Sequence, residues 1–130
     1  MASNTNTLKR LEVKYVRDGI KSRYPKRSEC AICGTTNDLE LHHYSTVNLL
    51  WEKWKADNGV TIEDAAHIML VREDFYSAHA KELLVDVVTL CNNHHKKLHA
   101  IYGKEPLLTT APKQIRWVQI QKEKLDVRET

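Results

Sequence analysis

The cysteines and most of the histidines of this 130-residue chain lie in two clusters that are far apart in the sequence. Each cluster opens with two metal-binding residues separated by two others, which is the spacing of the ligand pairs around a tetrahedral zinc ion. Three cysteines completed by one histidine form an accepted zinc set. The sequence therefore predicts one structural zinc ion, bound by Cys30, Cys33, Cys91 and His94.

Four histidines beside these zinc ligands are not needed by the zinc: His42, His43, His95 and His99. A zinc ion bound by both clusters would bring these four histidines close together. His95 and His99 are four residues apart, so on a helix they point the same way. Adjacent residues of a strand point to opposite faces, so His42 and His43 have different partners. We expect His42, His95 and His99 to hold a second metal ion, with His43 free as a general base.

The main alternative is a non-catalytic zinc module, because in most proteins two ligand pairs of this spacing bind a zinc ion that is purely structural. A module of this kind would bind nucleic acid without cleaving it. It would have no need for four further histidines at these offsets. The remaining histidines, His67 and His79, have no such companions, so we expect them at the surface or satisfied within the core.

Two short strands and a helix are expected to position the clusters. Alternating residues at Leu39–His43 predict a strand, and the β-branched run at 84–90 predicts a second strand that leads into Cys91. Asn92 can then cap a helix that continues to about Tyr102. This order places one cluster around the first strand and the other at the start of the helix. The predicted fold class is α+β.

Further helices are expected around this core. Apolar spacing predicts a helix from Thr7 to Ile20. A second is expected from Val47 to Asp57, a third is opened by Thr61 with Asp64 as its capping partner, and a fourth lies around 74–83. The expected organisation is a single domain with a basic N-terminal helix (1–29), a core (30–43 and 84–103), a helical insertion (44–83) and a C-terminal helix (104–130).

The arrangement resembles the HNH endonuclease family, whose ββα-metal core has a histidine or aspartate followed by histidine at the end of its first strand. The resemblance covers about 30–103, interrupted by the insertion. It implies that His42 binds a catalytic divalent ion, that His43 is the general base, and that His95 completes the metal site. His99 corresponds to a further ligand in the colicin-type nuclease domains.

Two positions depart from the family pattern. Asp86 lies where the family has an asparagine ahead of the second zinc pair, and it could accept a hydrogen bond from the base and raise its basicity. We therefore include Asp86 with His43 among the catalytic candidates. His94 stands where a cysteine is usual, which the zinc set tolerates.

Cleavage of phosphodiester bonds follows from these parts. A neutral imidazole can take a proton from water at neutral pH, and a divalent ion can polarise the phosphodiester. The resemblance implies products with 5′-phosphate and 3′-hydroxyl ends. Magnesium prefers oxygen ligands, whereas three imidazoles favour manganese, nickel, cobalt or zinc. The expected cofactors are therefore structural Zn²⁺ and a catalytic ion among Mg²⁺, Mn²⁺, Ni²⁺, Co²⁺ and Zn²⁺.

Basic residues are concentrated in the N-terminal segment, although the net charge is only +3. Such a segment suits a polyanion, because Lys and Arg neutralise phosphates. Runs of this kind are also found on ordinary solvated helix faces. We expect DNA as the partner, while RNA offers the same phosphodiester chemistry. The residues expected to contact it are Lys9, Arg10, Lys14, Arg17, Lys21 and Arg23.

The amino-acid composition indicates the cellular compartment in which the protein is expected. Three cysteines cannot all pair and two of them form a CxxC, so metal ligation under reducing conditions is favoured over a disulfide framework. No apolar run approaches membrane-spanning length, and the N-terminus lacks the features of a signal peptide. We expect a cytoplasmic protein of a bacterium or a phage-infected cell, without a membrane partner. Nothing in the sequence indicates its oligomeric state.

Overall fold

The computed structural model describes residues 3–129 and has an α+β fold in which helices surround a small two-stranded sheet. Among these residues, no helix is both long and apolar enough to cross a membrane. The elements in chain order are α1 (Ser3–Asp18), η1 (Lys21–Arg23), β1 (Leu39–His43), α2 (Val47–Asn58), α3 (Ala65–Ala78), η2 (Lys81–Val85), β2 (Val87–Cys91), α4 (Asn92–Tyr102), η3 (Leu108–Thr110) and α5 (Ala111–Glu129).

The sheet pairs β1 with β2 in antiparallel register, with Leu39 opposite Cys91 and His43 opposite Val87. The bounds of β1 agree with the prediction, whereas β2 begins later than residue 84. The reason is that Leu83 is fully buried against the helices, so the chain completes a π-helical turn, η2, before it extends. The register places the zinc-binding end of β2 beside the start of β1.

Helix α4 begins directly after the sheet. Its N-cap is Cys91 rather than the expected Asn92, because the Cys91 sulfur accepts a hydrogen bond from the backbone N–H of His94 at 3.5 Å. The helix ends before Gly103, whose φ of +90° is favourable only for glycine. One residue therefore serves both as predicted zinc ligand and as helix cap.

The other helices differ from their predicted bounds at several positions. Helix α1 begins at Ser3 rather than Thr7. The two helices expected in the second half of the insertion are one helix, α3, and its N-cap is Asp64, which accepts from the His67 N–H at 2.8 Å. Helix α5 includes Pro112 in its first turn, where a missing N–H costs no intrahelical hydrogen bond.

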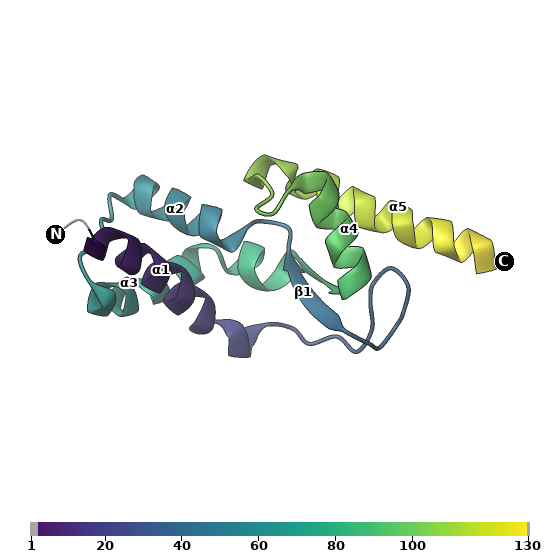
Figure 1. The fold of residues 1–130 in the computed structure, drawn as a ribbon, viewed down its shortest axis with the longest axis horizontal. Coiled ribbons are helices and arrows are strands. Elements are labelled where there is room, and N and C mark those ends of the chain that lie inside the picture. The colour runs from purple at the N-terminus through teal and green to yellow at the C-terminus, as the bar shows by residue number, and fades with distance from the viewer. Residues whose placement is uncertain (1–2, 130) are drawn as a thin grey trace.

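Two separate groups of buried side chains form the interior. The helical cluster joins α1, α2, α3 and η2 and contains Val16, Trp51, Phe75 and Leu83, among others. The sheet cluster contains Cys30, Leu90, Cys91, Leu98 and Val118, among others, and joins the sheet to α4 and α5. Figure 1 shows the same division, with α1, α2 and α3 gathered at one end of an elongated molecule and α5 at the other.

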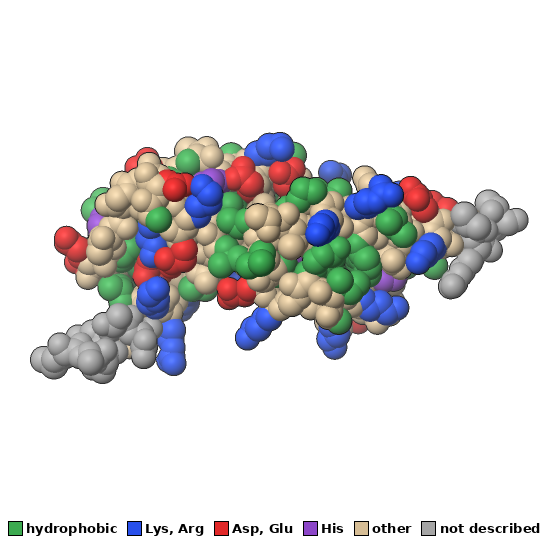
Figure 2. Space-filling view, turned by 90° about the horizontal axis from the view of Figure 1, so that it is seen from above, with side chains coloured by type: hydrophobic (Ala, Val, Ile, Leu, Met, Phe, Trp, Pro, Cys, Tyr) green, Lys and Arg blue, Asp and Glu red, His purple; other side chains and the backbone are tan. Residues whose placement is uncertain are grey.

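Charged side chains of both signs are interspersed on the face seen in Figure 2, around hydrophobic side chains near its middle. Exposed large hydrophobic residues include Ile101 and Leu107, on either side of the turn that follows α4. The face seen in Figure 2 therefore carries no large patch of a single charge.

A buried ion pair joins α1 to α2. The Glu12 carboxylate accepts from Lys55 Nζ at 2.5 Å and from Trp51 Nε1 at 3.1 Å, while Glu52 also lies 3.1 Å from the Lys55 ammonium. Glu12 and Lys55 are almost completely buried. A charge left unpaired at such a depth is strongly destabilising.

We expect Glu12→Gln to lower the free energy of unfolding by about 3 kcal/mol, because it leaves the Lys55 ammonium without its closest counterion. Urea denaturation followed by circular dichroism would measure this. The matched control is Asp57→Asn, which breaks the exposed Lys53–Asp57 pair and should cost less than about 1 kcal/mol. If both variants lost the same small amount of unfolding free energy, the Lys55 ammonium would have to be solvated by water once the Glu12 charge is removed.

Candidate metal centres and active site

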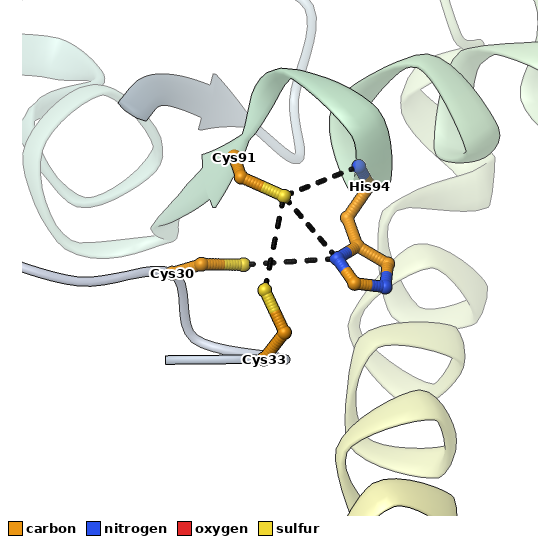
Figure 3. A group of neighbouring side chains, drawn as sticks. All are labelled: Cys30, Cys33, Cys91 and His94. Carbon is orange, nitrogen blue, oxygen red and sulfur yellow. Dashed lines mark hydrogen bonds between the residues drawn. The ribbon is translucent and has the colours of Figure 1, made fainter. Parts of the chain in front are cut away.

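The predicted zinc ligands meet at one point. Figure 3 shows the four side chains pointing towards one another. The sulfurs of Cys33 and Cys91 are 3.9 Å apart, and His94 Nδ1 lies 3.9 Å from the Cys30 sulfur and 3.3 Å from the Cys91 sulfur. Zinc bound to sulfur at about 2.3 Å holds two such sulfurs about 3.8 Å apart in a tetrahedron. The Cys₃His cluster therefore has the dimensions and the donor set of a tetrahedral zinc site.

The loop that carries the first two cysteines is shaped for this purpose. Gly34 has a φ of +73° and donates its N–H to the Cys30 carbonyl at 2.9 Å. The Ala31 N–H donates to the Thr89 carbonyl, which fixes the loop against β2. Burial opposes ionisation of Cys30, but hydrogen bonds from nearby backbone groups outweigh burial and lower the pKa of its thiol. The Cys30 thiol therefore ionises more readily than an ordinary thiol, whereas burial raises the pKa of the Cys33 thiol in the same cluster.

The second predicted cluster is also assembled. His42 from β1 and His95 and His99 from α4 turn one ring nitrogen each towards a common point. His42 Nδ1 lies 3.1 Å from His95 Nε2, which lies 3.0 Å from His99 Nε2. Nitrogens bound at about 2.1 Å to one ion, about 90–110° apart, are separated by about 3.0–3.4 Å. These spacings match those of three imidazoles around one metal ion.

The second nitrogen of each ring has its own partner outside the cluster. His95 Nδ1 is 2.8 Å from a Glu40 carboxylate oxygen, and His99 Nδ1 is 2.7 Å from the Gly103 carbonyl oxygen. Both oxygens can only accept, so both outer nitrogens carry the proton. Glu40 also accepts from the Asn92 amide at 3.1 Å, and these hydrogen bonds lower the pKa of its carboxyl. The inner nitrogens of His95 and His99 therefore present lone pairs when the rings are neutral.

Gln114 fixes the third ring in the same way. Its side-chain N–H₂ donates to the Tyr44 carbonyl at 3.1 Å and to the Thr110 hydroxyl at 2.9 Å, so its oxygen must face His42. His42 Nε2 then donates to that oxygen at 2.7 Å, leaving the lone pair on Nδ1. Gln114 is fully buried. Burial lowers the pKa of His42 to about 4, so its ring is neutral at pH 7.

Histidines that bind a metal are neutral, and in that form these three rings aim three lone pairs at one point. Three lone pairs that face one another repel unless a cation lies between them. Metal-binding histidines also typically have a partner on the outer nitrogen that fixes the ring tautomer. The sequence interpretation did not identify Glu40 or Gln114. Glu40 could have been found, because it lies two residues from His42 on an alternating strand. No local signal marks Gln114, whose position follows from the docking of α5.

His43 points away from the three-histidine cluster. Its Nε2 donates to the Leu83 carbonyl oxygen at 3.0 Å, and its ring packs edge-on against Tyr24 at 4.8 Å between centroids. With the proton on Nε2, the lone pair is on Nδ1. Burial is the main reason that the pKa of His43 falls to about 4, and the positive charge of Arg17 lowers it further, against the effect of the Leu83 hydrogen bond. The ring is thus neutral at pH 7 with an unprotonated Nδ1, and the same low pKa makes it a weaker base than an exposed imidazole.

The expected contact between Asp86 and His43 is a wrong prediction. The Asp86 carboxylate pairs with Lys81 at 3.4 Å, and the Asp86 carbonyl accepts from the Tyr44 N–H at 3.4 Å. Asp86 ends the π-helical turn, and that turn directs the carbonyl of Leu83 to His43 instead. A backbone group therefore makes the hydrogen bond that was expected from a side chain.

A cavity of about 190 Å³ joins His43 to the three-histidine cluster. Its walls come from α1, β1, the start of α2, α4 and the turn that follows α4. Of the predicted DNA-binding residues, Arg17 lines this cavity. Lys21 pairs with Asp18 and Arg23 pairs with Glu73. The remaining members, Lys9, Arg10 and Lys14, are exposed on α1.

The fold and the site define a small α+β protein with two side-chain clusters that could each hold a metal ion, and with a neutral histidine beside one of them. The family model of the phage T5 nicking endonucleases, described as the Nicking endonuclease family, matches residues 1–128. The chain belongs to this family and is an endonuclease that acts on DNA. This decides against the alternative of a zinc module without catalysis. No solved structure matches the chain.

Proposed function

We propose that the chain is a metal-dependent nicking endonuclease of the HNH type, with residues 30–43 and 84–103 as its ββα-metal core. The observation that carries the proposal is the convergence of three imidazole lone pairs beside a neutral histidine in one cavity. The N-terminal helix, the 44–83 insertion and the C-terminal helix would then support this core within a single domain.

The residues of the chain would divide the work as follows. His43 Nδ1 takes a proton from the attacking water, while the Leu83 carbonyl holds the ring and its tautomer. His42, His95 and His99 hold the divalent ion. When bound, that ion supplies a Lewis acid for the phosphodiester and stabilises the charge that develops on the leaving oxygen. The products would carry 5′-phosphate and 3′-hydroxyl ends.

Glu40 and Gln114 would act as positioning residues. Glu40 holds His95 and Gln114 holds His42, so that both rings present lone pairs to the ion. An all-imidazole set favours manganese, cobalt, nickel or zinc over magnesium. The Cys₃His cluster would hold a structural zinc ion that keeps Cys91 and the start of α4 beside the loop before β1.

A plasmid-nicking assay tests the proposal. Protein freed of exchangeable divalent ions should leave supercoiled plasmid intact, and added Mn²⁺ should restore conversion to the open circle. Activity that is unchanged after removal of these ions would contradict a metal-dependent mechanism.

His42→Ala should weaken Mn²⁺ binding at this site by at least about tenfold, because one of three ligands is lost. Isothermal titration calorimetry measures the affinity directly. The control is His67→Ala, which removes a ring that accepts the Glu63 N–H and lies far along the sequence from the cluster. Equal Mn²⁺ affinity in both variants would remove His42 from the metal site.

A further inference from the structure

One side of α1 carries a stripe of basic residues. Arg10, Lys14 and Arg17 are spaced by four and three residues, so they lie along the same face of the helix, and all three are exposed. The opposite side of α1 is fixed by Val16, which is buried in the helical cluster, and by the Glu12–Lys55 ion pair. The stripe therefore has a fixed orientation relative to the rest of the molecule.

The structure separates this stripe from the other basic residues of the segment. Arg23 is held by two hydrogen bonds to Glu73 at 2.9 and 3.2 Å and lies over the Tyr76 ring. Lys21 pairs with Asp18 at 3.1 Å. Lys9 lines a different recess, beside the Glu12–Lys55 pair. Within residues 7–126, the stripe residues form no ion pair.

The stripe leads into the cavity that contains His43. Val13 and Arg17 form part of its wall, together with the cluster of His42, His95 and His99, and Lys104 lines it as well. Glu105 is a carboxylate that lines the same cavity. Two positive side chains from segments far apart in the sequence thus border the space between the base and the three-histidine cluster.

We propose that the α1 stripe is the track along which the phosphate backbone of the cleaved DNA strand reaches the active site, with Arg17 as the contact next to the scissile phosphate and Lys104 on the other side of the cavity. The inference rests on the proposed function of that cavity. From Arg10 to Arg17 the helix rises about 10 Å, which equals the axial rise of about three nucleotides at 3.4 Å each. One stripe can therefore contact about three consecutive phosphates.

Salt dependence of binding tests the track without relying on cleavage. Every protein carries His43→Ala, so that the DNA stays intact, and no exchangeable divalent ion is added. The track variant is Arg10→Gln/Lys14→Gln/Arg17→Gln. The control is Lys26→Gln/Lys53→Gln/Lys124→Gln, which removes the same charge from exposed positions that lie off the stripe and outside the predicted set of DNA contacts. Fluorescence anisotropy with a labelled duplex gives the affinity at several salt concentrations.

The slope of log affinity against log salt should become shallower by about 2.7 in the track variant, which is three contacts at 0.9 each, and by less than 1 in the control. A similar change in both variants would reduce the effect to net charge and overturn the track, as would an unchanged slope in the track variant. If the binding data show this difference but wild-type protein with Mn²⁺ never nicks plasmid, the proposed cleavage mechanism is refuted and the track stands.

Removing the charge of single phosphates in the DNA would locate the track on the duplex. Duplexes with a single methylphosphonate at successive positions of the cleaved strand should bind the parent protein more weakly at about three consecutive positions on one side of the nick. The track variant should be insensitive at those positions, while the control variant keeps the parent pattern. Sensitivity that persists in the track variant would assign those phosphates to other residues.

Discussion

Replacing His43 with alanine is expected to lower the nicking rate by about a hundredfold or more, which is the usual contribution of a general base. The ring is partly buried and neutral, its Nε2 proton is donated to the Leu83 carbonyl, and its remaining lone pair is on Nδ1. Single-turnover nicking of a supercoiled plasmid at saturating Mn²⁺ would measure the loss. Mn²⁺ affinity should stay within a few-fold of wild type, because His43 does not belong to the three-histidine cluster.

His43→Ala and His42→Ala together separate the two roles of neighbouring residues. The first should reduce the rate with the metal still bound, and the second should reduce metal affinity. If calorimetry shows that His43→Ala abolishes Mn²⁺ binding, the assignment of the base is wrong. His67→Ala serves as the control for both and should leave rate and affinity unchanged.

Loss of the zinc site is expected to unfold the sheet end of the molecule. Structural zinc contributes about 10–16 kcal/mol of apparent binding free energy, which exceeds the stability of most small domains. His94→Ala should therefore abolish zinc retention and the cooperative thermal transition of the sheet cluster, to which Cys30 and Cys91 belong. Elemental analysis and circular dichroism measure the two effects.

His95→Ala is the matched control for this prediction, because it removes the adjacent histidine on the same helix turn. His95 belongs to the other metal-ligand cluster, so this variant should keep its zinc and its thermal transition while losing Mn²⁺ affinity. Zinc retained by His94→Ala in a folded protein, or lost from His95→Ala, would reassign the ligands.

Local spacing was sufficient to predict the elements that carry the ligands. Strand β1 has the predicted bounds, and α2 ends at Asn58, before Gly59 with its left-handed φ of +64°. The two ligand pairs converge because the strand register places Leu39 opposite Cys91. The three histidines converge because α4 packs against the sheet to which β1 belongs. The periodicity of hydrophobic residues and the spacing of metal ligands are properties of short segments, so they can be read directly from the sequence.

The groups that orient these residues were not predictable in the same way. Leu83 contributes a backbone carbonyl, which no side-chain pattern reveals, and its position depends on a π-helical turn where the β-branched run suggested a strand. Gln114 reaches His42 only because α5 docks against the sheet. Asp86 was assigned to the base by its place in a motif, yet in the fold its carboxylate has Lys81 as its partner.

The cavity that contains His43 and the three-histidine cluster lies where the helical cluster and the sheet cluster meet. Arg17 and Leu83 belong to segments anchored in the first cluster, while His95 and His99 are carried by α4, which packs in the second. A small rotation of one cluster against the other would withdraw the Leu83 carbonyl from His43 while both interiors stay buried. Local opening of this kind has a lower free energy than global unfolding. Mild denaturant would therefore silence the enzyme before its helices melt, with two cooperative units detectable by hydrogen exchange.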